Sequence, residues 1–183
     1  SFLGFTADRT MRSAQNLYEA GLITYLRTDG INISTSPNTG EPFSEENPGP
    51  PPLEEIRNVI SKKFGEDFLS KDVRVYKSKV KNSQEAHEAI RPTNIKTYPE
   101  NINLGQDEQK LYTLIWNRTL ASQMSNAQHE RKKIIICSSN DKYIFNSSSR
   151  KTLFEGFETL SKKDSQEIIE FPDNLKEKEE VNF

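Results

Sequence analysis

A tyrosine and an arginine two positions apart are the first residues of this sequence that could do chemistry. Tyr25 and Arg27 lie in residues 21–30, GLITYLRTDG, where the tyrosine has apolar neighbours. A rigidly held tyrosine hydroxyl can act as a nucleophile, and a guanidinium beside it can stabilise the negative charge that develops on a phosphoryl group. The same spacing is also typical of an ordinary strand tyrosine whose hydroxyl pairs with a neighbour.

A second stretch, residues 82–93 with the sequence NSQEAHEAIRPT, places a histidine four positions before an arginine. Asn82 followed by Glu85 fits a capping box, and the proline after the arginine is expected to end the helix. His87 and Arg91 are therefore predicted to share one face of a short helix. A lone histidine there is often structural, but histidine can also bind phosphate as a neutral donor or as a cation at lower pH.

Together the two stretches resemble the type IA DNA topoisomerases, and the form EAHEAIRPT resembles the bacterial topoisomerase I branch in particular. A third string agrees, because LYTLIWNR at residues 111–118, followed by ASQM at residues 121–124, is similar to a helix of that family at the same place in the chain order. The resemblance runs from about residue 3 to residue 127 and fades into generic β sequence afterwards.

The resemblance implies a role for each candidate residue. Tyr25 would attack a phosphodiester of single-stranded DNA and form a 5'-phosphotyrosine link, while Arg27 would bind the scissile phosphate. His87, together with Arg27 and Arg91, would contact DNA phosphates. Because the phosphotyrosine ester conserves the bond energy, strand passage and religation would relax negatively supercoiled DNA without ATP.

The resemblance also implies a cofactor and further domains. Members of this family need Mg²⁺ at an acidic site on a toprim domain, and no DxDxE-type string occurs in this sequence. We therefore expect no metal site within the chain and Mg²⁺ binding outside it, on the toprim and remaining domains of the same polypeptide. The first residue is Ser1 rather than methionine, and we expect an internal fragment that is inactive alone.

The periodicity of apolar residues predicts an α+β protein in two parts. Residues 1–126 are expected to form a mainly helical, tyrosine-bearing domain with a winged-helix-like element, interrupted by an inserted proline-rich loop at residues 36–52. Residues 127–183 are expected to form strands and an acidic C-terminal edge, and the resemblance implies that they are part of a β-rich arch domain. The predicted helices span residues 6–20, 53–64 and 107–124, an extended basic piece covers residues 71–81, and the predicted strands span residues 133–137, 142–146 and 166–171.

Composition narrows the class of protein further. No run of about 18 apolar residues suggests a membrane span, and the single cysteine, Cys137, cannot form an internal disulfide, so a cytoplasmic location is expected. The net charge is -2 overall, but residues 74–96 carry six Lys and Arg against two Glu, whereas residues 155–183 carry four Lys against nine carboxylates. A DNA-facing patch is expected in the first of these regions.

Two other functions are compatible with the same residues. A non-catalytic, winged-helix-like DNA-binding module could use the helix, turn and strand around Tyr25, and it would never bond covalently to DNA. A purely structural interaction domain would show no salt-dependent affinity for DNA.

Overall fold

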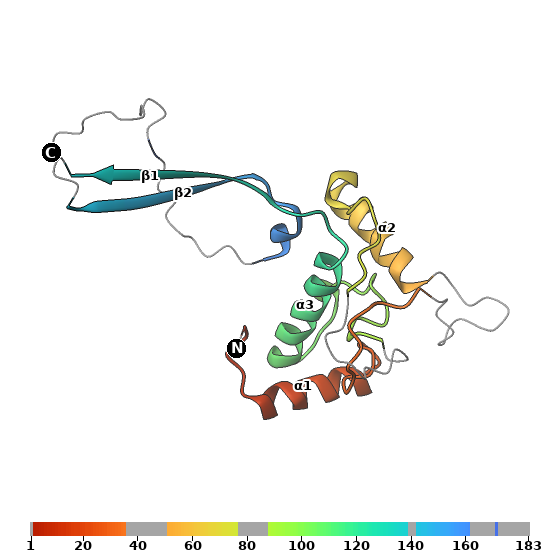
Figure 1. Ribbon diagram of the computed structural model, residues 1–183. Helices are drawn as coiled ribbons and strands as arrows, with labels where there is room; N and C mark the ends of the chain where they lie inside the picture. Colours follow the sequence, from red (N-terminus) through yellow and green to blue (C-terminus); the bar gives the residue numbers. More distant parts are fainter. Residues whose placement is uncertain (1, 36–50, 77–87, 139–141, 162–170, 172–183) are drawn as a thin grey trace. The chain divides into compact units, whose positions relative to one another are not determined.

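A computed structural model describes residues 2–35, 51–76, 88–138, 142–161 and 171 (Figure 1). The chain divides into two compact units, Ser1–Ser125 and Asn126–Phe183. The first unit contains three α-helices, and the second contains a two-stranded antiparallel sheet. The predicted α+β class is confirmed. None of the helices in the described residues is long and apolar enough to cross a membrane.

Helix α1, Ala7–Glu19, begins and ends as the sequence predicts. The Thr6 hydroxyl caps it by accepting a hydrogen bond from the Arg9 backbone N–H at 3.3 Å, and Gly21 follows its end with φ of 69°. The face that packs against α3 is made of small and aliphatic residues, namely Ser13, Ala14 and Leu17. Met11 and Tyr18 share the predicted apolar periodicity but remain exposed, because the close helix contact covers only the narrower face.

Helix α2, Pro52–Phe64, confirms the second prediction within one residue. Proline at its first position is preset to a helical φ, and Gly65, with φ of 103°, lies just past its end. Helix α3, Gln106–Ala121, stops three residues before the predicted end, because Met124 instead forms an isolated β-bridge with Leu69. Short 3₁₀ turns at Glu66–Phe68, Pro99–Asn101 and Gly156–Leu160 complete the helical elements of the described residues.

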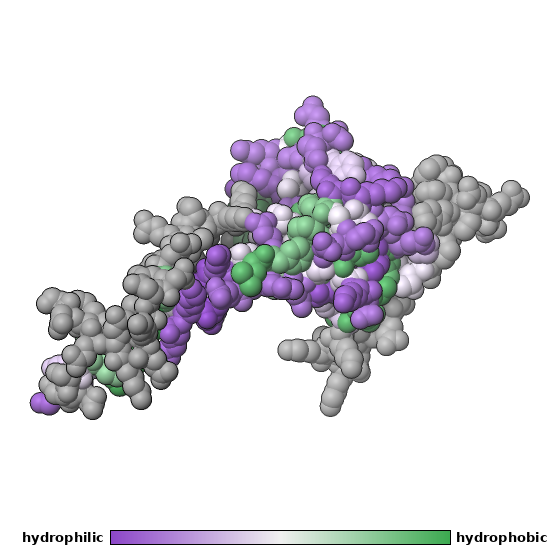
Figure 2. Space-filling view, turned by 90° about the horizontal axis from the view of Figure 1, so that it is seen from above, coloured by the Kyte–Doolittle hydropathy of each residue, from purple (hydrophilic) through white to green (hydrophobic). Residues whose placement is uncertain are grey.

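The core of the first unit lies between the three helices and the segment that follows α1. Its buried side chains come from all of these elements, with Tyr112, Trp116 and Leu120 on α3 among the most buried. The Trp116 indole N–H donates to the Ile95 carbonyl at 2.9 Å, so this large ring is both buried and satisfied. Figure 2 shows that the surface around this core is mostly hydrophilic.

The second unit contains a long β-hairpin. Strand β1, Gln128–Cys137, pairs with strand β2, Ile144–Phe154, in an antiparallel register that runs from Gln128 opposite Phe154 to Cys137 opposite Ile144. Both strands are longer than predicted, because their polar halves lack the apolar alternation on which the prediction relied. Of the third predicted strand, residues 166–170 lie outside the described residues, and Phe171 is not in a strand.

One of the predicted helices is wrong where the structure describes it. The helix expected over residues 82–91 is absent at residues 88–91, which are non-helical. The reason is tertiary, since Ala89 donates its backbone N–H to the Asn32 carbonyl at 2.9 Å instead of to a helical partner. The remaining positions of that helix, His87 included, lie outside the described residues. Residues 71–76 of the extended basic piece belong to no helix or strand, which does not contradict the prediction, and residues 77–81 lie outside the described residues.

Candidate active site

Tyr25 lies on the extended segment that leaves helix α1. Its neighbours Ile23 and Leu26 are buried in the core, whereas the Tyr25 side chain is 50% exposed. The ring meets the ring of Tyr18 edge-on, with 5.5 Å between centroids and 67° between planes. No hydrogen bond holds the Tyr25 hydroxyl within the part of the chain that the structure describes. The buried neighbours therefore fix the backbone of the segment while the hydroxyl remains accessible.

Arg27 is exposed on the same segment and makes no hydrogen bond or ion pair with any described residue. Arg9 on helix α1 is different, because its guanidinium binds the Asp107 carboxylate through two hydrogen bonds of 2.6 and 2.5 Å and lies 4.3 Å from the centre of the Phe5 ring. These hydrogen bonds lower the pKa of Asp107 and raise the pKa of Arg9. Arg27 is thus a cation available for a ligand, whereas Arg9 is already paired.

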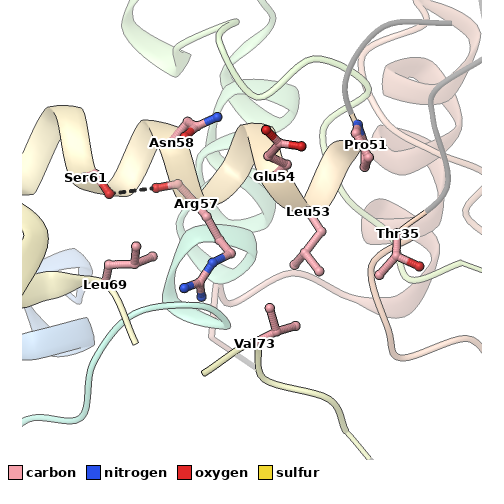
Figure 3. A pocket seen from close by; sticks show the side chains of 9 residues that line it. All are labelled: Thr35, Pro51, Leu53, Glu54, Arg57, Asn58, Ser61, Leu69 and Val73. Carbon is pink, nitrogen blue, oxygen red and sulfur yellow. Dashed lines mark hydrogen bonds between the residues drawn. The ribbon is translucent and has the colours of Figure 1, made fainter. Parts of the chain in front are cut away.

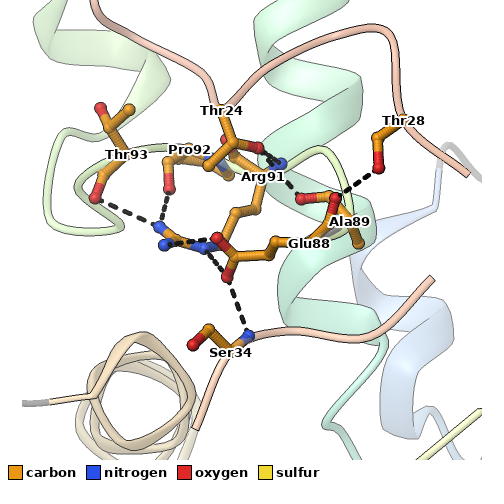
Figure 4. Close-up of polar contacts among 8 residues, drawn as sticks. All are labelled: Thr24, Thr28, Ser34, Glu88, Ala89, Arg91, Pro92 and Thr93. Atoms are coloured by element: carbon orange, nitrogen blue, oxygen red, sulfur yellow. Dashed lines mark hydrogen bonds and ion pairs between the residues drawn. The ribbon is translucent and has the colours of Figure 1, made fainter. Parts of the chain in front are cut away.

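The two motif stretches of the sequence lie side by side, although more than 50 residues separate them (Figure 4). Thr24 donates its backbone N–H to the Arg91 carbonyl at 2.9 Å, and Thr93 donates to the Leu22 carbonyl at 3.1 Å. Ile23 and Pro92 form an isolated antiparallel β-bridge. The segment that carries Tyr25 is therefore bound to the segment that begins at Glu88.

Two threonine hydroxyls strengthen this pairing on either side of Tyr25 and Arg27. Thr24 Oγ1 donates to the Ala89 carbonyl at 3.0 Å and accepts the Arg91 backbone N–H at 3.0 Å. Thr28 Oγ1 donates to the Glu88 carbonyl at 2.9 Å and accepts the Gly30 N–H at 2.9 Å. Both ends of residues 24–28 are thus attached to the same neighbouring segment.

Arg91 is 5% exposed and belongs to a buried network rather than to the surface. Its Nε and Nη2 donate to the two carboxylate oxygens of Glu88 at 2.6 and 3.0 Å, and its Nη1 donates to the Pro92 carbonyl at 2.8 Å. The Ser34 backbone N–H also donates to Glu88 Oε1, at 2.8 Å. The DNA contact predicted for Arg91 stays a prediction, and in this structure the guanidinium is already engaged.

Thr24, Thr28 and Glu88 were missed by the sequence analysis as residues of the site. All three stand inside the two motif stretches, so their proximity to Tyr25 and His87 in the sequence was a usable signal. The sequence could not predict that these residues attach one stretch to the other, because their hydroxyl and carboxylate groups form hydrogen bonds to groups distant in the sequence or across a turn.

The described residues contain no group of three or more His, Cys, Asp or Glu side chains that could hold a metal ion. A hollow of about 390 Å³ lies along helix α2, where Arg57 and Leu53 face Leu69 and Val73 (Figure 3). None of its lining residues is a predicted site residue. The chemistry suggested by the sequence therefore centres on the surface around Tyr25 and not on this pocket.

Comparison with known proteins agrees with the resemblance found in the sequence. The model of the DNA topoisomerase family matches residues 1–183. DNA topoisomerase 1 of Rickettsia bellii is 42% identical over 165 residues, which cover 85% of this chain and 19% of that protein. DNA topoisomerase 1 of Helicobacter pylori strain 26695 is 40% identical over 193 residues, which cover 100% of this chain and 24% of that protein.

A solved structure gives the same answer at the level of the fold. The structure of full-length topoisomerase I from Thermotoga maritima matches with a TM-score of 0.69 and 35% sequence identity, over 93% of this chain and 26% of that one. This chain thus spans between a fifth and about a quarter of the length of the relatives that it matches. With the family model matched along all 183 residues, the chain belongs to the DNA topoisomerase family, as a bacterial type IA member.

Proposed function

We propose that this chain carries the nucleophile of a type IA DNA topoisomerase and that the nucleophile is Tyr25. The observation that supports this most is the combination of a half-exposed tyrosine with buried neighbours and, two residues away, an exposed arginine that has no partner among the described residues. A nucleophile needs an accessible hydroxyl on a rigid backbone, and a developing phosphoryl charge needs a nearby cation. Tyr25 and Arg27 meet both requirements.

In the proposed reaction the Tyr25 oxygen attacks the phosphorus of a phosphodiester in single-stranded DNA. The bond between the tyrosine oxygen and phosphorus forms as the bond from phosphorus to the 3'-oxygen breaks. The tyrosine loses its proton to a base, and the 3'-oxygen gains one, so a 5'-phosphotyrosine and a free 3'-hydroxyl result. After another strand has passed, the 3'-hydroxyl reverses the step, which would relax negatively supercoiled DNA without ATP.

Arg27 would bind the scissile phosphate and stabilise its transition state, and His87 would contact a neighbouring phosphate. Mg²⁺ is part of this proposal only as a cofactor of the whole polypeptide. The described residues supply no cluster of carboxylates that fits it, and we propose that residues beyond this chain bind it.

Replacing Tyr25 with phenylalanine in the full-length topoisomerase that contains this chain tests the proposal. The variant lacks one oxygen, so it should fold and bind single strands while forming no covalent DNA adduct and relaxing no supercoiled DNA. Adducts are measured by trapping end-labelled single-stranded DNA on denatured protein. The matched control is Tyr143→Phe, which removes the hydroxyl from an exposed tyrosine just before strand β2. This variant should behave as the wild type.

An adduct that persists in Tyr25→Phe would overturn the assignment of the nucleophile. Salt-dependent binding without an adduct in any form of the protein, the wild type included, would instead favour the non-catalytic DNA-binding module.

A further inference from the structure

We propose that Arg91 and Glu88 form a positioning pair that holds Tyr25 and Arg27 at a fixed separation, instead of contacting DNA themselves. This inference rests on the proposed function of Tyr25. Its basis is the network that joins the pair to both ends of residues 24–28 (Figure 4).

The guanidinium of Arg91 is buried and fully engaged within the protein. The side chains of Arg91 and Glu88 are 6% and 24% exposed, whereas those of Arg9 and Asp107, which form a similar two-pronged pair, are 49% and 27% exposed. The guanidinium of Arg91 uses donors on all three of its nitrogens, toward one carboxylate and the carbonyls of Pro92 and Thr93. A phosphate could reach Arg91 only by breaking these bonds and leaving the Glu88 carboxylate without its cation.

The pair is attached to the segment that carries the tyrosine. Arg91 binds Thr24, the residue just before Tyr25, through both its backbone N–H and its carbonyl. Glu88 accepts from Thr28, the residue just after Arg27, through its carbonyl. The nucleophile and the adjacent cation therefore lie between two anchor points, and both anchors are set by the two members of one ion pair.

The carboxylate of Glu88 adds a third attachment. Its Oε1 accepts the Ser34 backbone N–H at 2.8 Å as well as the Arg91 Nε–H at 2.6 Å. The chain beyond Arg27 is thereby tied to the same pair that holds Thr24. Because in-line attack on phosphorus depends on sub-ångström placement of the nucleophile, loosening this frame should slow the chemical step more than it weakens DNA binding.

The test uses two kinds of variant in the full-length topoisomerase. Arg91→Lys and Glu88→Gln remove the two-pronged pairing, since lysine has no planar fork and a neutral amide cannot pair as a carboxylate does. Thr24→Val removes only the hydroxyl anchor, and Thr24→Ser keeps it. Asp107→Asn breaks the comparable pair on Arg9, which is not attached to residues 24–28, and serves as the matched control.

Single-turnover cleavage of labelled single-stranded DNA, affinity across a range of salt concentrations and melting temperature are measured for each variant. Arg91→Lys, Glu88→Gln and Thr24→Val should lower the cleavage rate by about 10- to 100-fold, the cost expected for a misplaced reacting group. The slope of log affinity against log salt should equal that of the wild type. Thr24→Ser and Asp107→Asn should cleave at the wild-type rate.

Several results would overturn the proposal. If Arg91 contacts a phosphate, a substitution that removes its charge, Arg91→Gln, would reduce the salt slope by about 0.7, as expected for one phosphate contact to a single strand. Unchanged cleavage in Thr24→Val and Glu88→Gln would show that the frame does not position the tyrosine. Equal loss of cleavage in Asp107→Asn would show a general effect of stability. Absence of any adduct in the wild type would overturn the proposed function itself.

Discussion

The exposure of Tyr25 and Arg27 is decided by their immediate neighbours. Ile23 and Leu26 are buried, and Tyr25 between them is half exposed, so two positions of one short segment anchor the backbone while the third presents a hydroxyl. Arg27 follows on the same segment without an acidic partner among the described residues. The buried apolar residues next to Tyr25 and Arg27 thus hold the backbone in place, and the reactive side chains remain outside the core.

Substitution of Arg27 should separate charge from geometry. Arg27→Ala should lower the rate of DNA cleavage by about 10²- to 10³-fold, the range seen when one donor to a developing charge is lost. Arg27→Lys should recover part of the rate, because lysine keeps the charge but lacks the planar fork. The measurement is single-turnover adduct formation in the full-length protein. Lys62→Ala, which removes an exposed cation near the end of α2, is the control, and cleavage by Arg27→Ala at the control's rate would contradict the role.

At the scale of elements, helix ends and cross-segment bonds determine where Tyr25 lies. Helix α1 ends just before Gly21, and the chain then runs extended because it pairs with residues 91–93. The segment at residues 88–91 has a helical sequence pattern, yet it forms bonds to Asn32 and Thr24 instead of to itself. A short helix would have gained few internal bonds, so the tertiary partners prevail.

Helix α3 supplies a pH-dependent contribution to stability. Burial raises the pKa of Tyr112 to about 12, and its hydroxyl donates to the Thr97 carbonyl at 2.8 Å. Between the ordinary pKa of about 10 and the raised value, the unfolded chain loses this proton and the folded chain keeps it, so stability should fall as the pH rises. The full effect corresponds to a loss of about 3 kcal/mol in the free energy of unfolding.

The measurement is chemical denaturation of the chain at about pH 9 and about pH 11.5, below and within the range where tyrosine titrates. Tyr112→Phe should be less stable at the lower pH, because the Thr97 carbonyl loses its donor, but it should lose less stability than the wild type as the pH rises. Tyr143→Phe, which changes an exposed tyrosine, should follow the wild type. Identical pH slopes for Tyr112→Phe and the wild type would contradict the assignment.

At the scale of the whole molecule, the chain consists of a helical unit that bears Tyr25 and a second unit built on the β1–β2 hairpin. The matched part of the chain covers 19% and 24% of the length of two of its relatives. Strand transfer needs a nucleophile, a phosphate-binding cation and a metal site around one phosphodiester. Only candidates for the first two can be named among the described residues.

The isolated chain should therefore fail to relax supercoiled DNA at any Mg²⁺ concentration. It should bind single-stranded DNA weakly, and the affinity should fall as salt rises, because residues 74–96 carry a net positive charge. A gel assay with purified chain and negatively supercoiled plasmid makes the measurement, with the full-length protein as the positive control. If the purified chain relaxes the plasmid and the Tyr25→Phe variant of the chain does not, carboxylates of this chain bind the metal.

Local sequence by itself determined the helices and the family. Helices α1 and α2 follow from apolar periodicity with Thr6, Pro52 and Gly65 near their ends, since these signals act within a few residues. Three strings in the right order predicted the topoisomerase family, which the comparisons confirm. The roles of Tyr25 and Arg27 came from the same strings and remain to be tested.

Tertiary structure decided what depends on partners distant in the sequence. The hydroxyl bonds of Thr24 and the non-helical path of residues 88–91 both arise from pairing across more than 50 residues. Periodicity could not predict these features, because it reports which residues share a face of one element and not which element will cover that face. Met11 shows the same limit, since its spacing is that of a core residue but no element within the described part of the chain lies over it closely enough to bury it.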